Sequence, residues 1–306
     1  MSDTDYLEKL NKTAVALGKF DGFHIGHMKL IDAVLKLQKQ GYTGVIFTFE
    51  MKENSVFNIN KMQNIFSPAE KRFIASETGV RKYIEYPFDD DLATMQPEEF
   101  VSRILVSMLD CRYVVVGSDY HFGFKRTGDV RTLEALGRRY GFEVIIIEKE
   151  TEQDEVISAT RIRKLIKAGD IQYANMLLGR KYCMTGIVCR GRQLGRTIGF
   201  PTANIKPVPG KLYPPAGVYA SKIFIPDMPD VRFTGVTNIG SNPTVNSSSD
   251  ISIETYIFDF NKELYGKKIA VELMDFVREE IKFPSFSHLQ SQLETDMNYV
   301  KKKYLT

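Results

Sequence analysis

The first half of the chain alternates between two patterns of apolar residues. Short apolar runs, each the length of a buried strand, occur at 14–17, 45–49, 113–117 and 142–147. Between them, apolar residues recur every three or four positions, as at Leu30, Ile31, Val34 and Leu37, which is the spacing of one helix face. Strands that alternate with helices predict an α/β domain in which helices cover both faces of a parallel sheet.

The pattern changes after residue 182. From there to residue 283, extended runs are separated by Pro, Gly, Asn and Ser, at 218–225, 232–237, 251–258 and 268–276. This is typical of a small antiparallel β-barrel or sandwich. One last helix is predicted, with a single apolar face formed by Leu289, Leu293, Met297, Val300 and Tyr304. We expect an α/β domain over residues 1–180 and an all-β domain, a barrel or a sandwich, with a C-terminal helix over residues 181–306.

The sequence Ser67-Pro68-Ala69-Glu70 marks one helix start. Ser67 is expected as the N-cap, Pro68 suits the first helical position, and Glu70 completes a capping box. The helix is expected to end near Gly79, because glycine readily adopts the left-handed conformation that follows many helices.

Composition limits the class of protein. Hydrophobic residues make up 43% of the 306 residues and charged residues 26%, as in ordinary soluble globular proteins. A net charge of +3 is too small to indicate a nucleic-acid partner. The three cysteines, Cys111, Cys183 and Cys189, show no CxxC spacing, and the sequence has neither a signal-peptide pattern nor an apolar run long enough for a membrane span. We expect a cytoplasmic protein without a membrane partner.

The first candidate site is the glycine-rich stretch 18–27, GKFDGFHIGH. It follows a strand and precedes a helix, so backbone N–H groups at the helix start favour an anion there. The glycines lack the spacing of a GxGxxG dinucleotide fingerprint, and no P-loop is present. His24 and His27 could be surface histidines or two ligands of an incomplete zinc site, but their place between strand and helix favours a phosphate-binding turn.

A second basic helix start lies at 157–163, ISATRIR. Ser158 or Thr160 could serve only as a helix cap. Arg161 and Arg163 in the first turns are unfavourable beside the helix dipole unless an anion is bound. A phosphate chain held between the two helix starts would supply that anion. The chemistry implied is attack on the α-phosphorus of ATP with pyrophosphate leaving, which needs in-line positioning and matched donors.

The stretch 190–204, RGRQLGRTIGFPTAN, carries the densest set of candidate residues. Its glycines would leave backbone N–H groups open to a phosphate, and they are Gly191, Gly195 and Gly199. An ordinary basic loop or a nucleic-acid patch would also carry arginines of this kind. Thr202 and Asn204 offer two oxygens on one face of an extended chain, which suits Mg²⁺.

These stretches resemble one known family. GKFDGFHIGH is similar to the HxGH element of the nucleotidyltransferase superfamily, and the whole string resembles prokaryotic bifunctional riboflavin kinases/FAD synthetases. Further matches follow in family order at 117–128, 157–163, 190–204, 238–244, 254–260 and 278–283. The resemblance implies a Rossmann-like nucleotidyltransferase domain that makes FAD from FMN and ATP, followed by a riboflavin kinase barrel that makes FMN from riboflavin and ATP.

The resemblance also implies residue roles. In FAD synthesis it implies catalysis by His24, His27 and Arg161. It implies contact with the ATP phosphates by Gly18, Phe20, Gly22, Ser158 and Thr160. In the kinase it implies Glu254 as general base, Mg²⁺ ligands at Thr202 and Asn204, and ATP contacts at Gly191, Arg192, Gly195 and Gly199. Flavin would be bound in the two halves by Asp119, Phe122 and Arg126 and by Asn238 and Arg278.

Three positions depart from the family pattern, namely Met51, Tyr120 and Ala159. None removes a proposed catalytic group. Two alternatives stand beside the bifunctional enzyme: a kinase whose adenylyltransferase is lost or redirected, and a flavin-responsive regulator that binds RNA. For the enzyme we expect ATP, riboflavin and FMN as substrates, Mg²⁺ as cofactor, no nucleic-acid partner, and a monomer or weak homo-oligomer.

Overall fold

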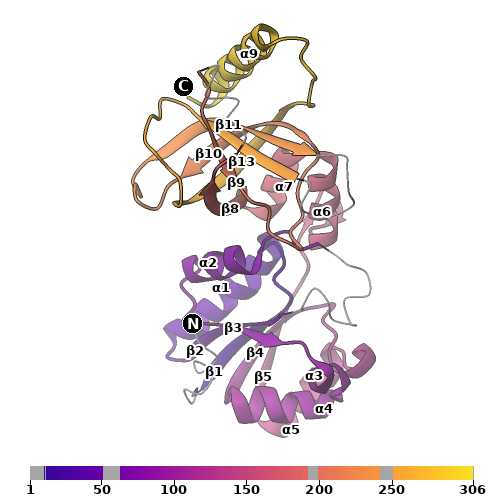
Figure 1. Ribbon diagram of the computed structural model, residues 1–306. Coiled ribbons are helices and arrows are strands. Elements are labelled where there is room, and N and C mark those ends of the chain that lie inside the picture. Colours follow the sequence, from indigo (N-terminus) through magenta and orange to yellow (C-terminus); the bar gives the residue numbers. More distant parts are fainter. Residues whose placement is uncertain (1–9, 11, 51–62, 192–198, 242–250, 306) are drawn as a thin grey trace. The chain divides into compact units, whose positions relative to one another are not determined.

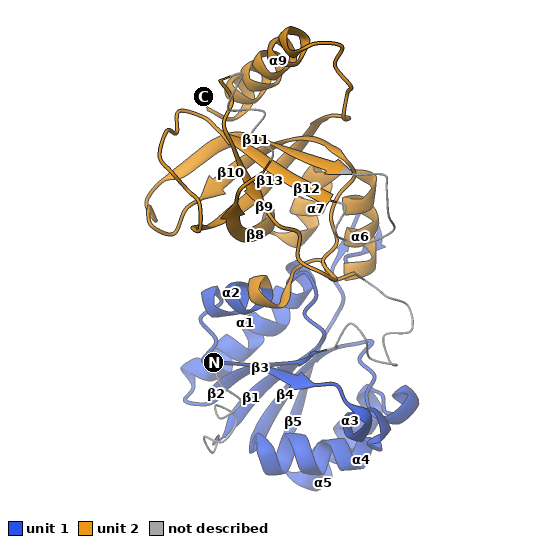
Figure 2. Ribbon diagram, in the orientation of Figure 1, with its two compact units in different colours: residues 1–62, 71–158 blue, residues 63–70, 159–306 orange. Residues whose placement is uncertain are grey.

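The structure is a computed structural model that describes residues 10, 12–50, 63–191, 199–241 and 251–305 (Figure 1). The chain divides into two compact units. Unit 1 holds residues 1–62 and 71–158, and unit 2 holds residues 63–70 and 159–306 (Figure 2). Each unit has its own cluster of buried apolar side chains.

A parallel sheet forms the centre of unit 1. Among the described residues, five strands pair in the order β3-β2-β1-β4-β5, and every pair is parallel. The strands are β1 (Thr13–Leu17), β2 (Thr43–Glu50), β3 (Lys82–Pro87), β4 (Cys111–Gly117) and β5 (Glu143–Ile147). All residues of β1 are buried, because the strand lies in the middle of the sheet and is covered on both faces. The predicted parallel sheet is confirmed.

Helices cover both faces of this sheet (Figure 1). On one face lies α1 (Ile25–Lys39), and its buried residues are the four expected from the spacing: Leu30, Ile31, Val34 and Leu37. On the other lie a π-helix, η2 (Val101–Met108), and α5 (Val130–Tyr140), whose Leu133 shares a core with Val15 and Phe47. The helix α2 (Pro68–Glu77) begins in unit 2 and continues into unit 1. The shorter elements are α3 (Asp90–Thr94), α4 (Pro97–Phe100), η3 (Phe124–Arg126), β6 (Thr151–Glu152) and β7 (Glu155–Val156).

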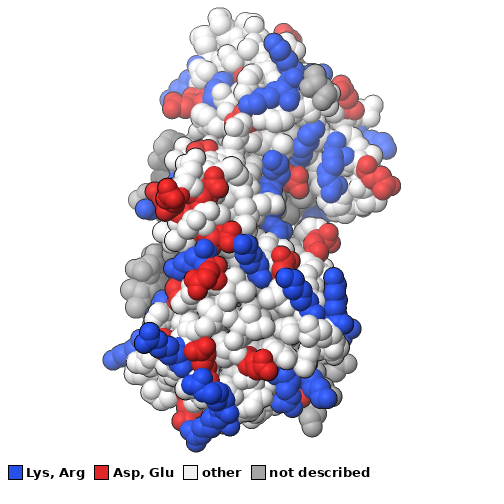
Figure 3. Space-filling view, turned by 180° about the vertical axis from the view of Figure 1, so that it is seen from behind, with Lys and Arg blue, Asp and Glu red and all other residues white. Residues whose placement is uncertain are grey.

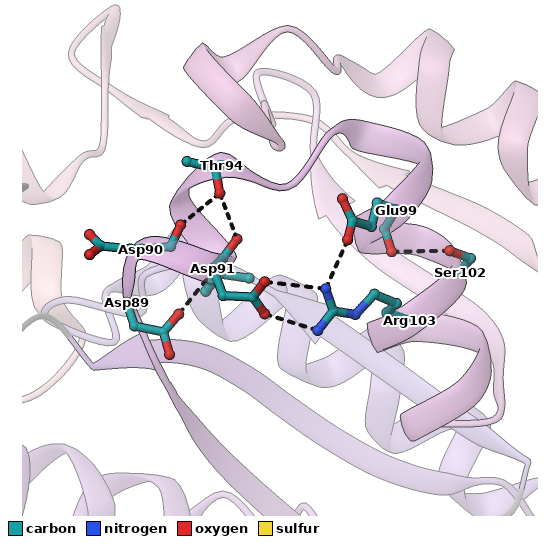
Figure 4. Close-up of polar contacts among 8 residues, drawn as sticks. Asp89, Asp90, Asp91, Thr94, Glu99, Ser102 and Arg103 are labelled. Carbon is teal, nitrogen blue, oxygen red and sulfur yellow. Dashed lines mark hydrogen bonds and ion pairs between the residues drawn. The ribbon is translucent and has the colours of Figure 1, made fainter.

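Exposed polar contacts tie the short helices of unit 1 together (Figure 4). The side chain of Asp89 caps α3 by accepting a hydrogen bond from the Leu92 N–H at 3.0 Å. Arg103 on η2 donates to both carboxylate oxygens of Asp91 at 2.9 and 3.3 Å, and to Glu99 at 2.8 Å. Because these side chains are exposed to water, the pairs fix local geometry more than they stabilise the fold.

Unit 2 is built around a closed antiparallel barrel. Within the described residues its strands pair in the order β10-β11-β12-β9-β8-β13, and β13 pairs with β10 to close the barrel. The strands are β8 (Tyr182–Cys189), β9 (Thr202–Ile205), β10 (Gly217–Phe224), β11 (Arg232–Ser241), β12 (Ile251–Ile257) and β13 (Lys268–Arg278). The sequence left a barrel and a sandwich open, and the structure is the barrel.

Helices precede and follow the barrel strands in the sequence. α6 (Ala159–Ala168) and α7 (Ile171–Leu178) precede it, so unit 2 begins before the change of pattern at residue 182. α9 (Phe286–Tyr304) packs on the outer face of the barrel, where Val300 and Met297 join the cluster that contains Val218 and Val236. This contact uses the apolar helix face expected from the sequence.

Residues 63–70 also belong to unit 2, although they lie between two strands of unit 1 in the sequence. Asn64 and Lys211 form a parallel β-bridge. In it the Asn64 N–H donates to the carbonyl of Gly210 at 2.8 Å, and the Leu212 N–H donates to the carbonyl of Asn64 at 2.7 Å. This segment is therefore held in unit 2 by backbone pairing.

The segment ends in a buried ion pair. Lys211 Nζ lies 2.6 Å from Glu70 Oε2, and the two side chains are 0% and 1% exposed. The carboxylate of Glu70 also accepts from the N–H groups of Ser67 and Thr185, each at 2.8 Å, and Lys211 Nζ donates to the carbonyl of Ile65 at 3.0 Å. The expected capping box of Ser67 and Glu70 is present. Glu70 has a second role, as a buried counter-ion, that the sequence did not indicate.

Charges of both signs are mixed over the surface. On the face drawn in Figure 3, lysine and arginine side chains intersperse with aspartate and glutamate, in keeping with the net charge of +3. None of the helices in the described part of the chain is long and apolar enough to cross a membrane.

Removing one partner of the buried ion pair should destabilise unit 2. Lys211→Met leaves Glu70 buried without its cation, so we expect the free energy of unfolding to fall by about 3–5 kcal/mol. The double variant Glu70→Gln/Lys211→Met has no buried charge there and keeps a side-chain oxygen for Ser67 and Thr185. Its free energy of unfolding should fall by less than the falls in the single variants Glu70→Gln and Lys211→Met added together. Guanidinium unfolding followed by circular dichroism measures these changes.

The exposed ion pair of Arg103 is the control for this experiment. Arg103→Met removes contacts of similar length to Asp91 and Glu99 but leaves no charge buried, so stability should change little. If Lys211→Met and Arg103→Met behaved alike, burial would not be what gives the Glu70–Lys211 pair its importance.

Candidate active sites

The first candidate site lies where the strand order of unit 1 reverses. From β1 the chain continues to β2 and β3 on one side of the sheet, whereas β4 and β5 lie on the other side. The neighbours β1 and β4 end beside Gly18 and at Gly117. Open parallel sheets bind ligands in the crevice outside the carboxyl ends of strands at such a point. The predicted phosphate-binding turn therefore occupies the ligand-binding edge of the sheet.

The turn between β1 and α1 has a strained backbone. Phe20 and Phe23 have φ angles of 44° and 43°, in the left-handed region that bulky residues rarely adopt, and Gly22 has φ 93°. Both phenylalanine rings are fully buried, and the ring of Phe20 packs on that of His27 with centroids 5.2 Å apart. Strain of this kind persists only where packing enforces it, and it is concentrated at functional sites.

His24 and His27 lie together at the start of α1. His24 is the N-cap, and its Nδ1 accepts from the backbone N–H of His27 at 3.4 Å. The two rings are stacked, with centroids 3.7 Å apart. Nδ1 of His27 is buried and has no hydrogen-bond partner among the described residues. Buried polar atoms without a partner are uncommon in folded proteins, so this nitrogen marks His27 as a candidate functional residue.

Burial keeps both imidazoles neutral at pH 7. It lowers the pKa of His24 from 6.5 to about 4. Burial, together with the neighbouring His24, lowers the pKa of His27 well below its ordinary value. A neutral imidazole donates one N–H and accepts at its other nitrogen. The pair can therefore supply hydrogen bonds to phosphate oxygens without carrying a fixed positive charge.

The loop after β4 carries the predicted flavin residues of unit 1. Asp119 pairs with Lys149 at 2.9 Å, and both side chains are exposed. Tyr120, one of the departures from the family pattern, stacks on Phe122 with centroids 5.8 Å apart, and Phe122 lies in the core cluster. Arg126 is exposed. Asp119 and Arg126 are thus accessible from solvent, whereas Phe122 supports the loop from the core.

The second helix start of the predicted ATP site is divided between the units. Ser158 is the last residue of unit 1, while Ala159 and Thr160 open α6 in unit 2. Arg161 Nη2 donates to the hydroxyl of Tyr173 at 2.6 Å, and its guanidinium lies over that ring. A common ATP site formed by this helix start and the histidine pair stays a prediction.

The second candidate site follows from the strand register of the barrel. Asn204 on β9 pairs with Glu254 on β12, which in turn pairs with Asn238 on β11. Val218 on β10 pairs with Asn238 on one side and with Arg278 on β13 on the other. Directly paired residues of antiparallel strands share a face of the sheet. The row therefore runs over the outer face that Val218 shares with α9. Arg278 lies beside a register shift between Val218 and Tyr219, and its ion pair with Asp296 of α9 places it on the same outer face.

Thr202, Asn204 and Glu254 form a polar group in this row. Thr202 Oγ1 donates to Glu254 Oε2 at 3.3 Å, and Asn204 Nδ2 lies 3.4 Å from Thr202 Oγ1. Gly191 lies against Asn204, because a Cβ atom at position 191 would be 2.5 Å from Asn204 Oδ1. Only a glycine fits at position 191 against Asn204, so the backbone of the glycine-rich stretch lies directly beside this polar group.

Part of the predicted phosphate stretch lies outside the described residues, including Arg192 and Gly195, and the departure at Met51 does too. Gly199 is described and has φ 83° with open space beside it, so a side chain there would be strained by the backbone rather than by a neighbour. The ring of Phe200 packs edge-on against Tyr256 with centroids 5.2 Å apart.

The predicted flavin residues of the barrel have partners that the sequence did not indicate. Asn238 Nδ2 donates to Glu280 Oε1 at 3.1 Å. Arg278 donates to Asp296 of α9 from Nε at 3.0 Å and from Nη2 at 2.7 Å. Asp296 lies on the helix face that is otherwise apolar. An acidic residue on such a face was the signal that could have revealed it, since a buried carboxylate needs a partner.

Oxygen donors, rather than a cluster of strong metal ligands, mark the second site. Over the described ranges, no group of three or more His, Cys, Asp or Glu side chains could hold a metal ion. Thr202 Oγ1 lies beside the Glu254 carboxylate, whereas Asn204 directs Nδ2 towards Thr202 and Oδ1 towards Gly191. Such a sparse set fits Mg²⁺, which keeps several waters and binds largely through substrate phosphates.

Two family models match the chain one after the other. The FAD synthetase model matches residues 7–161, and the riboflavin kinase model matches residues 178–304. A bifunctional riboflavin kinase/FMN adenylyltransferase from Bacillus subtilis is 35% identical over 94% of this chain and 92% of its own. The protein of that name from Listeria monocytogenes is 37% identical over 96% of this chain and 92% of its own.

One crystal structure is similar over almost the whole chain. It is described as a macrolide-efflux protein from Streptococcus pneumoniae. It is 29% identical, has a TM-score of 0.84, and the match covers 95% of this chain and 94% of that one. The likeness extends through both units.

The buried histidines should make stability sensitive to acid. The pKa of His24 is about 4 in the folded protein against 6.5 for an ordinary imidazole, so the unfolded chain binds protons first as the pH falls. The stability that His24 contributes is therefore full above about pH 6.5 and lost as the pH falls towards 4, by about 2 kcal/mol at pH 5. Thermal unfolding between pH 7.5 and 5 measures the loss.

His24→Asn is the informative variant, because asparagine keeps an N-cap side chain but cannot be protonated in this range. It should reduce the pH dependence, whereas the same substitution at the exposed His121 should leave it unchanged. A variant that loses stability as steeply as the natural protein would contradict a role of His24 burial.

Proposed function

Because this chain belongs to the family of bifunctional riboflavin kinases/FMN adenylyltransferases, we propose that its two candidate sites divide the two reactions between them. The enzyme phosphorylates riboflavin with ATP to give FMN, and it adenylylates FMN with a second ATP to give FAD and pyrophosphate. The barrel, in a functional domain of residues 181–306, performs the first reaction. The sheet edge of unit 1, in a functional domain of residues 1–180, performs the second.

In the kinase site Glu254 acts as the general base. Its carboxylate takes the proton of the riboflavin 5′-hydroxyl as that oxygen bonds to the γ-phosphorus of ATP and the bond to the ADP oxygen breaks. The observation that carries this assignment is the polar row, in which Thr202 Oγ1 donates to Glu254 at 3.3 Å with Asn204 and Asn238 paired on either side. The phosphates of ATP bind the glycine-rich stretch, including Gly191, Arg192, Gly195 and Gly199.

Thr202 and Asn204 would hold Mg²⁺ through their side-chain oxygens. Both side chains are neutral, so binding depends on the charge of the nucleotide phosphates. Mg²⁺, when bound, neutralises part of the charge on the phosphate oxygens.

In the adenylyltransferase site the neutral histidines bind the phosphates of ATP. A phosphate oxygen of FMN bonds to the α-phosphorus and the bond to the pyrophosphate oxygen breaks, so negative charge moves onto the leaving group. Hydrogen bonds from His24 and His27 stabilise this charge as it develops. The other proposed contacts to ATP are Gly18, Phe20, Gly22, Ser158, Thr160 and Arg161.

The flavin contacts follow the same division. FMN lies beside the loop after β4, where Asp119 and Arg126 are accessible and Phe122 holds the loop in place. Riboflavin lies along the outer row of the barrel, in contact with Asn238 and Arg278. A flavin ring needs both an apolar surface and a few oriented donors and acceptors, and each of these places offers aromatic and polar side chains together.

Glu254→Gln should abolish FMN formation and leave the conversion of FMN to FAD largely intact. Glutamine is close in size and still accepts a hydrogen bond from Thr202, but it cannot take a proton. Chromatography of products from riboflavin with ATP, and separately from FMN with ATP, measures both reactions. Glu272→Gln, another partly buried carboxylate on a barrel strand, should retain both activities. Equal loss of both activities in Glu254→Gln would overturn the division between sites.

His27→Ala should impair the conversion of FMN to FAD and leave FMN formation largely intact. Loss of a donor to the developing charge should lower FAD formation from FMN by roughly 10²–10³ in rate. Riboflavin phosphorylation should continue, since the kinase residues lie in unit 2. His121→Ala, at an exposed histidine, is the control. A kinase defect as large as the adenylyltransferase defect would indicate misfolding, and an unchanged rate of FAD formation would remove His27 from the mechanism.

A further inference from the structure

The C-terminal helix supplies a buried carboxylate to the last residue of β13. Asp296 on α9 has a side chain that is only 2% exposed. Its oxygens accept from Arg278 Nε at 3.0 Å and Arg278 Nη2 at 2.7 Å, and from Gln292 Nε2, one turn earlier, at 2.9 Å. A carboxylate in an otherwise apolar helix face is costly unless its charge is paired. The pairing with Arg278 is what permits Asp296 at this position.

This contact fixes the guanidinium without using all of its donors. Arg278 carries five N–H groups in one rigid plane. Asp296 engages the edge formed by Nε and Nη2, and Nη1 donates to the carbonyl of Glu279 at 2.9 Å. These contacts leave one N–H on each terminal nitrogen for a further acceptor. An arginine held along one edge presents its other donors in a defined direction.

Arg278 also lies in the same row as Glu254. Val218 pairs with Arg278 and with Asn238, and Asn238 pairs with Glu254. The guanidinium carbon lies 5.8 Å from the centre of the Phe283 ring. Oriented donors thus stand beside an aromatic surface on the face from which a flavin would have to present its hydroxyl to Glu254.

We propose that Asp296 is a positioning residue for riboflavin binding: it orients Arg278 so that the remaining N–H groups bind an acceptor atom of the flavin. The proposal rests on the proposed function, because it takes Arg278 as a flavin contact. Asp296 itself does not touch the flavin. Its removal weakens flavin binding by letting the guanidinium turn away, and it leaves Glu254 and the ATP-binding stretch unaltered.

The test is the steady-state kinetics of the kinase reaction in full-chain variants. Asp296→Asn should raise the KM for riboflavin about tenfold, as expected for the loss of a well-oriented hydrogen bond to a charged group. The kcat and the KM for ATP should stay within about twofold, because their determinants are untouched. A general loosening of the fold would not produce this split. Fluorescence titration with riboflavin gives the dissociation constant independently.

A matched control is available on the same two elements. Asp275 on β13 is paired with Lys303 on α9, and this pair joins the strand to the helix without contact to Arg278. Asp275→Asn should leave the KM for riboflavin unchanged. A rise as large as that of Asp296→Asn would mean that any loosening of α9 suffices, and it would overturn the proposal.

Two further variants, Gln292→Leu and Arg278→Lys, separate a failure of the positioning role from a failure to fold and from a failure of the proposed function. Gln292→Leu removes one hydrogen bond to Asp296 without leaving a buried charge unpaired, so it should fold normally and raise the KM for riboflavin two- to threefold. If Asp296→Asn fails to fold, an unchanged KM in Gln292→Leu overturns the proposal.

If Arg278→Lys leaves the KM unchanged, the proposed flavin role of Arg278 fails and the inference fails with it. If Arg278→Lys raises the KM but Asp296→Asn does not, only the positioning role is overturned.

Discussion

Unit 2 depends on a buried ion pair between residues that are 141 positions apart in the sequence. Water reaches neither Glu70 nor Lys211, so each charge is tolerable only because the other is present. The same carboxylate bonds to Thr185 on β8, the strand that leads into the glycine-rich stretch at 190–204. A kinase fragment cut at residue 178, where the riboflavin kinase model begins to match, would keep Lys211 but lose Glu70 and the carbonyl of Ile65, both of which bond to it. The sequence limits of a family match and the physical limits of a folding unit are therefore different.

The two candidate sites arise from different properties of their sheets. In unit 1 the strand order reverses between β1 and β4, and open parallel sheets bind ligands outside the carboxyl ends of their strands at such a point. In unit 2 there is no such edge, because the barrel closes on itself. Its polar residues are brought together by the pairing of neighbouring strands, which sets Asn204, Glu254 and Asn238 side by side. The two candidate sites thus arise from strand order in one unit and from strand register in the other.

Local patterns predicted most of the elements and the places in the fold where the candidate sites lie. The spacing of Leu30, Ile31, Val34 and Leu37 identified the buried face of α1, and the capping box of Ser67 and Glu70 identified the start of α2. These features depend on residues within one or two helical turns of each other. The partners of Glu70 and Arg278 could not be found in this way, because Lys211 and Asp296 reach them only through the tertiary fold. The neutral state of His24 likewise depends on burial, which no neighbouring residue in the sequence reveals.

Buried hydroxyl groups inside the barrel help to set the register of its strands. Ser221 and Thr237 lie 2.8 Å apart and Thr237 and Thr255 3.0 Å apart, oxygen to oxygen, all of them buried. These hydroxyl groups form hydrogen bonds from β10 to β11 and from β11 to β12, and the bonds depend on the present register. A slip of one residue in β12 would turn Thr255 outward and Glu254 into the apolar interior. Glu254, the proposed base, thus lies on the outer face of β12 because Thr255, its neighbour in the chain, is fixed on the buried face of the same strand.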